Sequence, residues 1–356
     1  MKKICILSAV NVKHMSLISI YTKYFEEHGI EYDIIYMDKY NEDEDIGAKN
    51  IYRFINIIDH KWSKIHKVLK YSKFISYAKG VIKKENYDKI IVWNDVAILM
   101  FGMFLAKRCK HKYCLNCRDY NGEKNPIIYY IFKKTIENSY FTTISSGGFR
   151  TFLPKYNYID LYSYNDKLLQ SCEPRCDLSG TSLRIGFVGN VRFFEENYKL
   201  LNSLKNDSRY EIHYHGSNSE IIEEYAKSNG FNNVICSGSF PVNETGKYLN
   251  ECDIINNVFG NDSIAVKSLT SIRLFHAAYM HMPILVSKET YMEELVKTYG
   301  IGYVIDFDDK DLADHLFEWY KNIDFEELER NCNRLISVAT KSNNNFYDKL
   351  QDFIDN

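Results

Sequence analysis

The sequence predicts an α/β protein built from two doubly wound domains that face each other across a cleft. The chain has 356 residues, which is more than one hydrophobic core usually supports, so two domains are expected. In both halves, short apolar runs rich in β-branched and aromatic residues alternate with helical patterns, as in parallel sheets made of βαβ units. Between the halves the periodicity is lost and Pro, Gly and Ser gather, as they do in interdomain linkers.

These patterns divide the chain into four segments. Residues 1–165 form the first Rossmann-like domain, 166–182 the linker, 183–335 the second Rossmann-like domain, and 336–356 a C-terminal helix that could cross back onto the first domain. In such domains ligands bind beyond the carboxyl ends of the strands, so the loops that follow the strands are the places to look for a site.

The elements follow in order along the chain. The first domain begins with a strand at 3–9, a polar loop from Asn11 to His14 and an amphipathic helix from Met15 to His28. Its further strands are expected at 32–38, 88–95, 111–117 and 140–145. The strands of the second domain are expected at 183–189, 210–216, 233–238, 253–259, 283–287 and 302–306. A last helical pattern runs from Phe325 to Phe353.

Composition indicates a soluble globular protein of a reducing compartment. Hydrophobic residues make up 45% and charged residues 26%, and the apolar runs are too short and too often interrupted to cross a membrane. The two lysines and short apolar run at the N-terminus lack a cleavage site, so they are interpreted as a first strand rather than a signal peptide. Nine cysteines scattered over both halves do not make a disulfide framework. A cytoplasmic location is expected.

The two halves differ in charge. Residues 1–165 carry 26 Lys and Arg against 17 Asp and Glu, and residues 166–356 carry 19 against 30, which gives net charges of +9 and −11 and the overall −2. A basic half joined to an acidic half suggests different partners, with an anionic surface or acceptor on the basic side.

The first motif that could carry chemistry is GFVGNVR, from Gly186 to Arg192. A buried strand ends at Gly189, the chain turns through Asn190, and a cation follows at Arg192. Glycine lets backbone amides approach a phosphate closely, and arginine can bind a phosphate with two hydrogen bonds. The alternative is that Gly189 only makes a tight turn and Arg192 is solvated.

The second motif is the stretch from Asn256 to Ser287, where a polar loop precedes a helix that runs to Met280. Three hydroxyl residues could cap this helix: Ser268, Thr270 and Ser271. With Lys267 and Arg273 close by, backbone N–H groups, the helix dipole and two cations could converge on a pyrophosphate. The alternative is an ordinary crossover with a capped helix.

Five segments in this order and spacing resemble the C-terminal domain of the GT-B glycosyltransferases, especially those of the retaining family four. They are GFVGNVR, HYHGSNSE, CSGSF, SIRLFHAAYMHMPILVS and YGIGYVID, and the resemblance covers 183–306. The chain is similar to bacterial enzymes of capsular and exopolysaccharide biosynthesis. The resemblance implies the GT-B architecture and a nucleotide-sugar donor site in the second domain.

The resemblance also implies roles for individual residues. The donor would be bound by loop and helix residues of the second domain: Gly189, Asn190, Arg192, Gly216, Gly238, Ser239, Phe240, Asn261, Lys267, Thr270, Ser271, Ile272, Arg273 and His276. Arg118 and Asp119 stand where the family often has a His-Asp pair facing the reacting sugar, and His14 lies in the loop that matches the one over the cleft. These three are the expected catalytic residues.

The chain departs from the family pattern at three positions. Ser268 and His276 stand where two glutamates separated by seven residues are common, and His281 replaces the usual glycine two before Pro283. The loss of both carboxylates changes how ribose and sugar hydroxyls would be held. Histidine can still hydrogen-bond a hydroxyl, and the alternative for His276 is a packed core residue.

The stretch from His60 to Lys84 is basic and aromatic, without an acidic residue. Such a helix suits the surface of an anionic membrane, where it would meet a lipid-linked acceptor. The residues expected at that surface are Lys61, Trp62, Lys64, Lys67, Lys70 and Lys73. The alternatives are a solvated basic helix or a nucleic-acid patch, and no nucleic-acid partner is expected.

Two further signals are interpreted as structural, and no metal site is expected. Asp306 and Asp308 match an Asp-x-Asp metal motif, but they follow a strand and are expected to cap a helix from Asp309 onward. Cys114 and Cys117 lie three apart on a strand, so they point to opposite faces.

The expected function is glycosyl transfer from a nucleotide-sugar, with UDP favoured, to a polysaccharide or lipid-linked acceptor at the inner face of the membrane. The resemblance implies retention of configuration, no cofactor and no metal. Two alternatives stay open: a nucleotide-sugar 2-epimerase of the same fold, and a non-catalytic nucleotide-sugar-binding scaffold subunit.

Overall fold

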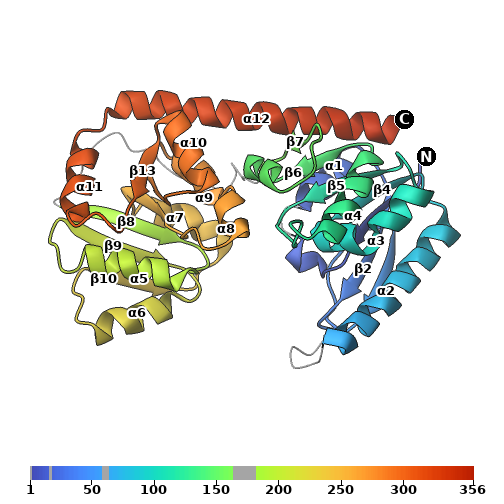
Figure 1. Ribbon diagram of the computed structural model, residues 1–356, viewed down its shortest axis with the longest axis horizontal. Coiled ribbons are helices and arrows are strands. Elements are labelled where there is room, and N and C mark those ends of the chain that lie inside the picture. Colours follow the sequence, from blue (N-terminus) through green and yellow to red (C-terminus); the bar gives the residue numbers. More distant parts are fainter. Residues whose placement is uncertain (1, 16–17, 58–63, 163–181) are drawn as a thin grey trace. The chain divides into compact units, whose positions relative to one another are not determined.

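The structure is a computed structural model that divides into two compact units (Figure 1). It describes residues 2–15, 18–57, 64–162 and 182–356, with the backbone alone for 64–69. Unit 1 comprises Met1–Leu161 and Ser342–Asn356, and unit 2 comprises Tyr162–Lys341. The expected linker, 166–182, lies outside the described residues except at its last position.

Unit 1 contains a seven-stranded sheet in the described part of the chain, and all its strand pairs are parallel. The strands are β1 (Ile4–Ser8), β2 (Tyr32–Asp38), β3 (Asn50–Ile55), β4 (Lys89–Trp93), β5 (Tyr113–Cys117), β6 (Thr142–Ile144) and β7 (Ile159–Asp160). Their order, β3-β2-β1-β4-β5-β6-β7, reverses direction between β1 and β4, as in doubly wound Rossmann sheets.

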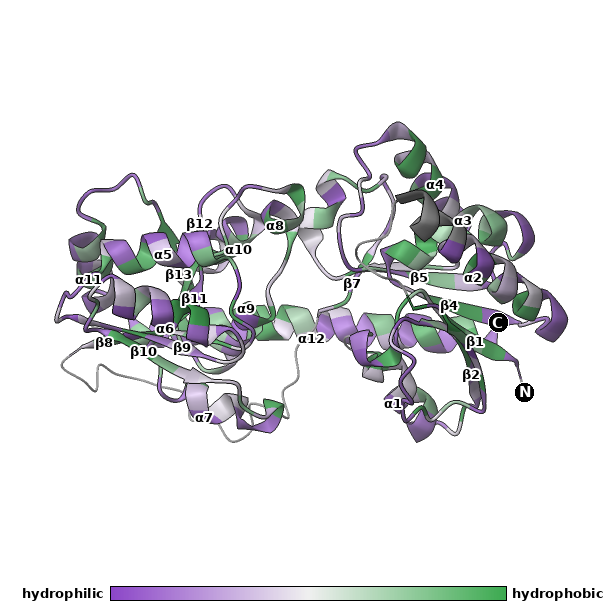
Figure 2. Ribbon diagram, turned by 90° about the horizontal axis from the view of Figure 1, so that it is seen from below, coloured by the Kyte–Doolittle hydropathy of each residue, from purple (hydrophilic) through white to green (hydrophobic). Residues whose placement is uncertain are grey.

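Helices cover both faces of this sheet (Figure 2). They are α1 (Ser19–Glu27), α2 (Lys64–Glu85), α3 (Asp95–Arg108), α4 (Pro126–Glu137) and the two 3₁₀ helices η1 (Val12–His14) and η2 (Gly147–Thr151). Figure 2 shows α2, α3 and α4 on one face. On the other face, α1 packs with the end of α12 (Phe325–Asp355).

The last turns of α12 complete the core of unit 1. Phe346, Leu350 and Phe353 are fully buried in the cluster that contains the β1 and β2 side chains. The ring of Phe346 lies edge-on to Tyr21 of α1, with 5.2 Å between centroids. A segment more than 180 residues away in sequence therefore supplies part of this core.

Unit 2 contains a six-stranded parallel sheet in its described residues, in the order β10-β9-β8-β11-β12-β13. The strands are β8 (Leu183–Val188), β9 (Tyr210–His215), β10 (Val234–Gly238), β11 (Ile254–Asn257), β12 (Ile284–Ser287) and β13 (Gly302–Ile305). The helices are α5 (Phe194–Ser203), α6 (Ser219–Ser228), α7 (Thr245–Leu249), α8 (Ile264–Ser268), α9 (Ile272–Tyr279), α10 (Tyr291–Tyr299), α11 (Leu312–Lys321), the first part of α12, and the 3₁₀ helix η4 (Val242–Glu244).

Two clusters of buried side chains lie on opposite faces of this sheet. Ile185 and Phe187 of β8 belong to the cluster that contains α5 and α11 residues, and Val188 belongs to the one that contains α9, α10 and α12 residues. Successive side chains of a strand point to opposite faces. This burial on both faces explains the continuous apolar runs by which the strands were predicted.

The second sheet matches the prediction strand by strand, within one or two residues at each end. In unit 1, β3 and β7 were not predicted. The helix expected from Asp309 also differs, because α11 begins at Leu312, and Asp306 and Asp308 contact Lys288 Nζ at 2.6 and 2.8 Å instead of capping a helix.

We expect the substitution Phe346→Ala to destabilise unit 1 by about 3–5 kcal/mol, because it empties a fully buried site. Hydrogen exchange followed by mass spectrometry reports each unit separately, and β1 and β4 amides should exchange faster. The control is Val338→Ala, at a position of α12 that is 44% exposed. Unchanged exchange in unit 1 of the Phe346 variant would contradict the role assigned to α12.

Candidate functional site

The candidate donor site in unit 2 begins with two glycine turns at the carboxyl ends of β8 and β9. Gly189 has φ 114° and Gly216 has φ 134°, values that side chains strongly disfavour. Gly189 N donates to His215 O at 2.8 Å. A Cβ built on Gly216 would lie 1.9 Å from Gly189 O. The two turns therefore pack backbone against backbone, and Gly216 has no room for a side chain.

Arg273 lies beneath the first of these turns. It is the second residue of α9, where Ser271 Oγ caps the helix by accepting from Arg273 N at 3.2 Å. Its Nε donates to Val188 O at 3.1 Å, and its Cζ lies 3.8 Å from the centroid of the Phe187 ring. A Cβ on Gly189 would come within 3.3 Å of Nη2. The guanidinium is thus fixed between an aromatic ring and the glycine turn.

The guanidinium has no acidic partner in the part of the chain that the structure describes. Arg273 is only 7% exposed, and no described carboxylate lies within 4 Å of its nitrogens. Burial, and next to it the charge of Arg192, lowers the pKa of Arg273 to about 9. Buried charges are normally paired, so this arrangement leaves a positive site that an anion would complete.

His276 follows Arg273 by one turn of α9 and is also unsatisfied. It is 6% exposed, and neither ring nitrogen has a hydrogen-bond partner among the described residues. Burial, followed by the charge of Arg273, lowers the pKa of His276 to about 4, so the ring is neutral at pH 7. A neutral imidazole offers one donor and one acceptor to a bound molecule.

The loop after β8 is held in place by Asn197 of α5. Asn197 Nδ2 donates to Arg192 O and to Phe193 O, each at 2.9 Å, and its Oδ1 accepts from Tyr214 and Asn256. Arg192 itself is exposed. A buried amide that the sequence did not mark therefore positions the predicted phosphate loop.

The loop after β11 contains the other predicted donor residues, and here the structure corrects one expectation. Lys267 belongs to a separate short helix, α8, and its exposed Nζ lies 3.4 Å from Glu289 Oε2. Its contact with a donor phosphate stays a prediction. Ser268 ends α8, and its Oγ donates to Ile264 O at 2.6 Å. It does not cap α9.

Asn261 and Thr270 belong to the same connection. Asn261 Nδ2 donates to Lys288 O and Glu289 Oε2, both at 3.2 Å. The loop is pinned by Ser287, whose Oγ accepts from the backbone N–H groups of Phe259 and Gly260 at 3.1 and 2.8 Å. Thr270 is half-buried just before the Ser271 cap.

The residues predicted to bracket the base follow β10. Gly238 has φ 74°, and its N–H donates to Ser219 Oγ at 3.0 Å. Ser239 is exposed, and Phe240 packs on Tyr248 with 4.4 Å between centroids. Ile272, the first residue of α9, is exposed. This edge therefore offers an aromatic pair close in sequence to Gly238, whose N–H and carbonyl groups are both hydrogen-bonded within the protein.

In unit 1, the predicted pair Arg118 and Asp119 follows β5 and is anchored by a residue that the sequence did not mark. Asp95 Oδ2 accepts from the backbone N–H groups of both, at 2.7 and 2.9 Å. Asp119 is exposed, whereas the Arg118 guanidinium lies over the Trp93 ring at 5.4 Å. Burial lowers the pKa of Arg118. Asp95 thus holds the backbone of this turn.

Asp95 and Glu123 are buried acids beside this turn. Asp95 is 1% exposed, and burial raises its pKa to about 8. Burial also raises the pKa of Glu123. Asp95 Oδ1 and Glu123 Oε1 have no hydrogen-bond partner in the described part of the chain. Perturbed buried acids at the carboxyl end of a sheet are typical of functional sites.

His14 ends the predicted loop after β1. Asn11 holds this loop by donating from Nδ2 to Asp38 Oδ1 at 2.7 Å. The His14 ring is exposed and lies 5.3 Å from the Tyr40 ring. It is therefore available to a ligand of unit 1.

The basic helix α2 is less aromatic on its surface than the sequence suggested. Phe74 is fully buried and packs on Phe101, and Tyr77 packs on Phe54. Lys73 is exposed and Lys70 half-buried. Lys61 and Trp62 lie outside the described residues, and only the backbone is described for Lys64 and Lys67. Among the described helices, none is long and apolar enough to span a membrane.

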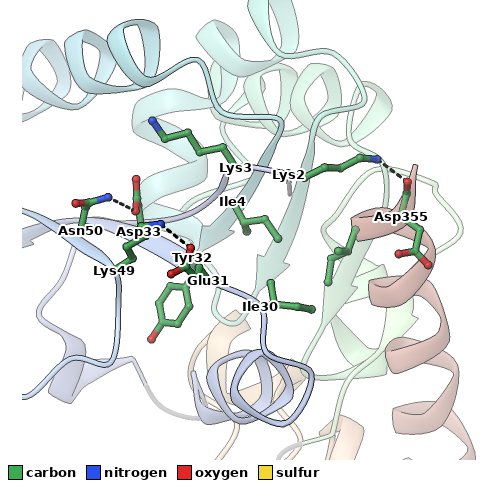
Figure 3. A pocket seen from close by; sticks show the side chains of 11 residues that line it. Lys2, Lys3, Ile4, Ile30, Glu31, Tyr32, Asp33, Lys49, Asn50 and Asp355 are labelled. Carbon is green, nitrogen blue, oxygen red and sulfur yellow. Dashed lines mark hydrogen bonds and ion pairs between the residues drawn. The ribbon is translucent and has the colours of Figure 1, made fainter.

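A cavity of about 670 Å³ lies at the amino ends of β1, β2 and β3 (Figure 3). Two of its lysines already have partners: Lys49 Nζ lies 2.6 Å from Glu31 Oε2, and Lys2 Nζ donates to the backbone carbonyl of Asp355 at 2.5 Å. Ligands of doubly wound sheets bind at the opposite, carboxyl edge. This cavity is therefore not the candidate site.

The sequence matches no protein-family model and no curated protein. Solved structures do match it over almost its whole length. A sucrose-phosphate synthase from Thermosynechococcus elongatus is 13% identical, with 99% of each chain covered and a TM-score of 0.72. A glycosyltransferase from Rickettsia africae is 12% identical, with 100% of this chain and 99% of that chain covered and a TM-score of 0.68.

HepE of Anabaena, solved in complex with UDP-glucose, is 13% identical, with 99% of this chain and 100% of that chain covered and a TM-score of 0.64. At this level of identity the likeness concerns the fold. The chain has the GT-B fold, with its two Rossmann-like α/β units.

We expect Gly216→Ala to destabilise unit 2 by more than about 3 kcal/mol, because the new Cβ meets backbone atoms of Gly189 and φ is unfavourable. Gly230→Ala is the control. It also has a positive φ, but nothing lies within 4 Å of the added Cβ, so a loss of about 1–2 kcal/mol is expected. Hydrogen exchange of β8 and β9 measures both. Equal losses of stability in the two variants would show that the Gly189 and Gly216 turns are not in contact.

We expect Asp95→Asn to flatten the pH dependence of unit 1 stability. The folded carboxyl has a pKa of about 8, whereas the unfolded one ionises near pH 4. Its stabilising contribution is therefore complete below pH 4 and is lost as the pH rises toward 8. Urea denaturation between pH 5 and 8.5 should show a steeper loss in the unaltered protein and in the control Asp348→Asn, an exposed position. If the unfolding free energy of Asp95→Asn changes with pH as it does in the unaltered protein, the raised pKa of Asp95 is refuted.

Proposed function

We propose that this chain transfers a sugar from a nucleotide-sugar, with a UDP-sugar favoured, to a polysaccharide or lipid-linked acceptor of a capsule or other surface glycan. The observation that carries the proposal is the buried guanidinium of Arg273, which lies beneath the Gly189 turn without a carboxylate partner among the described residues. The fold shared with HepE of Anabaena, solved with UDP-glucose, supports the same donor class.

The diphosphate would bind where Gly189, Arg192 and Arg273 converge. The N-terminus of α9 favours an anion, and Arg273 has four N–H donors beyond the one given to Val188. As the bond between sugar and diphosphate breaks, negative charge grows on the leaving phosphate. Fixed cations and dipoles stabilise that charge without rearranging, so transfer would need no metal ion at this position.

The sugar and the acceptor would be handled by other groups. His276, neutral and without a described partner, would hydrogen-bond a hydroxyl of the donor. In unit 1, Asp119 and His14 would position the acceptor hydroxyl, with the Asp119 turn held by Asp95. Retention of configuration and attachment of the basic helix α2 to an anionic membrane belong to the same proposal, as does a cytoplasmic location.

A non-catalytic donor-binding subunit is the second candidate, and one observation favours it. The positions where related enzymes have two glutamates hold Ser268, whose hydroxyl donates to Ile264 O, and the neutral His276. Neither supplies a negative charge to the sugar. A chain of this kind would bind the donor and not turn it over. A 2-epimerase would need acid and base groups around the sugar, and these two positions do not provide them.

We expect one nucleotide diphosphate, or its sugar conjugate, to raise the melting temperature in a panel of UDP, GDP, dTDP and CMP ligands. A ligand at 100 times its dissociation constant stabilises the folded chain by about 2.7 kcal/mol. Arg273→Ala should abolish the shift and lower turnover at least tenfold, because the buried cation is lost. Arg330→Ala, which removes an exposed arginine of the same unit, should leave both unchanged.

The outcomes separate the candidates. A shift with glycan product supports the transferase, and a shift without turnover supports the binding subunit. If no nucleotide shifts the melting temperature, or if the Arg273 variant responds as the unaltered protein does, the donor site is not where we place it.

A further inference from the structure

Two buried histidines and a glutamate converge in unit 2 beside the β9 turn. His213 and His215 are separated by one residue on β9, so their side chains lie on the same face of the sheet. Glu251 lies between α7 and β11. One ligand atom from each of the three residues lies within 4.8 Å of the other two. Residue spacing does not reveal this cluster, because Glu251 comes from a turn more than 30 residues after the two histidines.

One nitrogen of each histidine ring contacts an oxygen atom, and this contact orients the ring. His213 Nε2 lies 3.3 Å from Glu211 Oε2, and His215 Nδ1 lies 2.9 Å from Ser237 Oγ. The other nitrogen of each ring, His213 Nδ1 and His215 Nε2, is buried and has no hydrogen-bond partner among the described residues. Histidines that bind metals show this arrangement, with one nitrogen held by an oxygen and the other presented to the ion.

Glu251 brings a carboxylate to the free nitrogen of His215. Its Oε2 lies 3.6 Å from His215 Nε2. This distance is too long for a hydrogen bond, and Nε2 has no hydrogen-bond partner among the described residues. If Ser237 accepts from Nδ1, a lone pair of Nε2 faces the carboxylate. A cation between the two groups removes this repulsion.

We propose that His213, His215 and Glu251 form a zinc site, with His213 Nδ1, His215 Nε2 and a Glu251 oxygen as ligands. Two imidazoles and one carboxylate are a ligand set typical of zinc. A tetrahedral ion with bonds of about 2.0–2.1 Å keeps its ligand atoms about 3.4 Å apart, close to the 3.6 Å between His215 and Glu251. The Glu251 side chain is 44% exposed, so the fourth position opens toward solvent.

The ion would stabilise the donor-site framework without taking part in sugar transfer. His215 O accepts from Gly189 N at 2.8 Å, so fixing the His215 ring fixes the strand end that holds the phosphate turn. The His215 ring also packs on Tyr248, with 4.6 Å between centroids, next to the aromatic edge formed with Phe240. Zinc would link Glu251, in the turn before β11, to the two histidines of β9.

The competing arrangement is a purely hydrogen-bonded cluster. If Ser237 donates to His215 Nδ1, then His215 Nε2–H points at Glu251. That tautomer still leaves His213 Nδ1 buried without a partner in the described residues, which lowers the stability of the folded state. Zinc satisfies all three groups at once, and the hydrogen-bonded cluster does not.

The test is metal binding by the full-length protein. Protein purified without chelator is expected to contain one zinc per chain by elemental analysis. After removal of the metal, Co²⁺ should give the visible spectrum of a tetrahedral site, and Zn²⁺ should displace it. Zn²⁺ should also raise the melting temperature of the metal-free protein.

Two variants make the test specific. Glu251→Gln alters an exposed side chain, so it should fold normally, checked by circular dichroism, yet lose the cobalt spectrum. Ser237→Ala should weaken zinc affinity by about 10–100-fold, because His215 Nδ1 loses the hydrogen bond that orients the ring. The control is His315→Gln, which changes an exposed histidine paired with Asp309 and should behave as the unaltered protein does.

The proposal is overturned if the unaltered protein binds no zinc or cobalt, or if Glu251→Gln binds them as tightly. None of these readouts uses a nucleotide or measures glycosyl transfer. The zinc site can therefore fail while the proposed function stands, and the reverse also holds.

Discussion

The candidate donor site of the second unit depends on the buried guanidinium of Arg273. It stacks on Phe187 and donates to Val188 O, which satisfies one of its five N–H donors and leaves its charge uncompensated by any described carboxylate. Removing such a charge from water is unfavourable unless an opposite charge and hydrogen bonds compensate for the lost hydration. The glycine turns above it are constrained by close packing: a Cβ on Gly216 would meet the Gly189 carbonyl at 1.9 Å, and a Cβ on Gly189 would lie 3.3 Å from the guanidinium.

Most of the fold could be predicted because the central strands are buried on both faces and appear as continuous apolar runs. The strand β3 was missed for the opposite reason. It lies at the edge of the sheet, its residues are exposed or half-buried, and Arg53 interrupts its apolar pattern. The two-residue strand β7 and the short helix α8 are set by tertiary contacts, and neither is long enough to show a period.

The site could be predicted only in part. Gly189, Ser271 and Arg273 were found because a glycine after a strand and a hydroxyl before a helix are local signals. Asp95 was missed because its role depends on accepting hydrogen bonds from residues more than 20 positions later. His213 and His215 show a pattern with a period of two on a strand, but Glu251 joins them only through the fold, so residue spacing alone could not identify the cluster.

Unsatisfied groups cluster at the carboxyl ends of the strands in both units. Asp95, Glu123, His213, His215 and His276 each have a buried atom without a hydrogen-bond partner in the described part of the chain, and each such atom lowers stability by about 1–3 kcal/mol. A fold selected for stability alone would fill these positions with apolar residues. Their retention is understandable if ligands supply the missing partners, because a sugar hydroxyl at His276 and a cation at His215 would each recover that free energy on binding. In both units, the groups that lower the stability of the ligand-free chain are therefore those that ligand binding would stabilise.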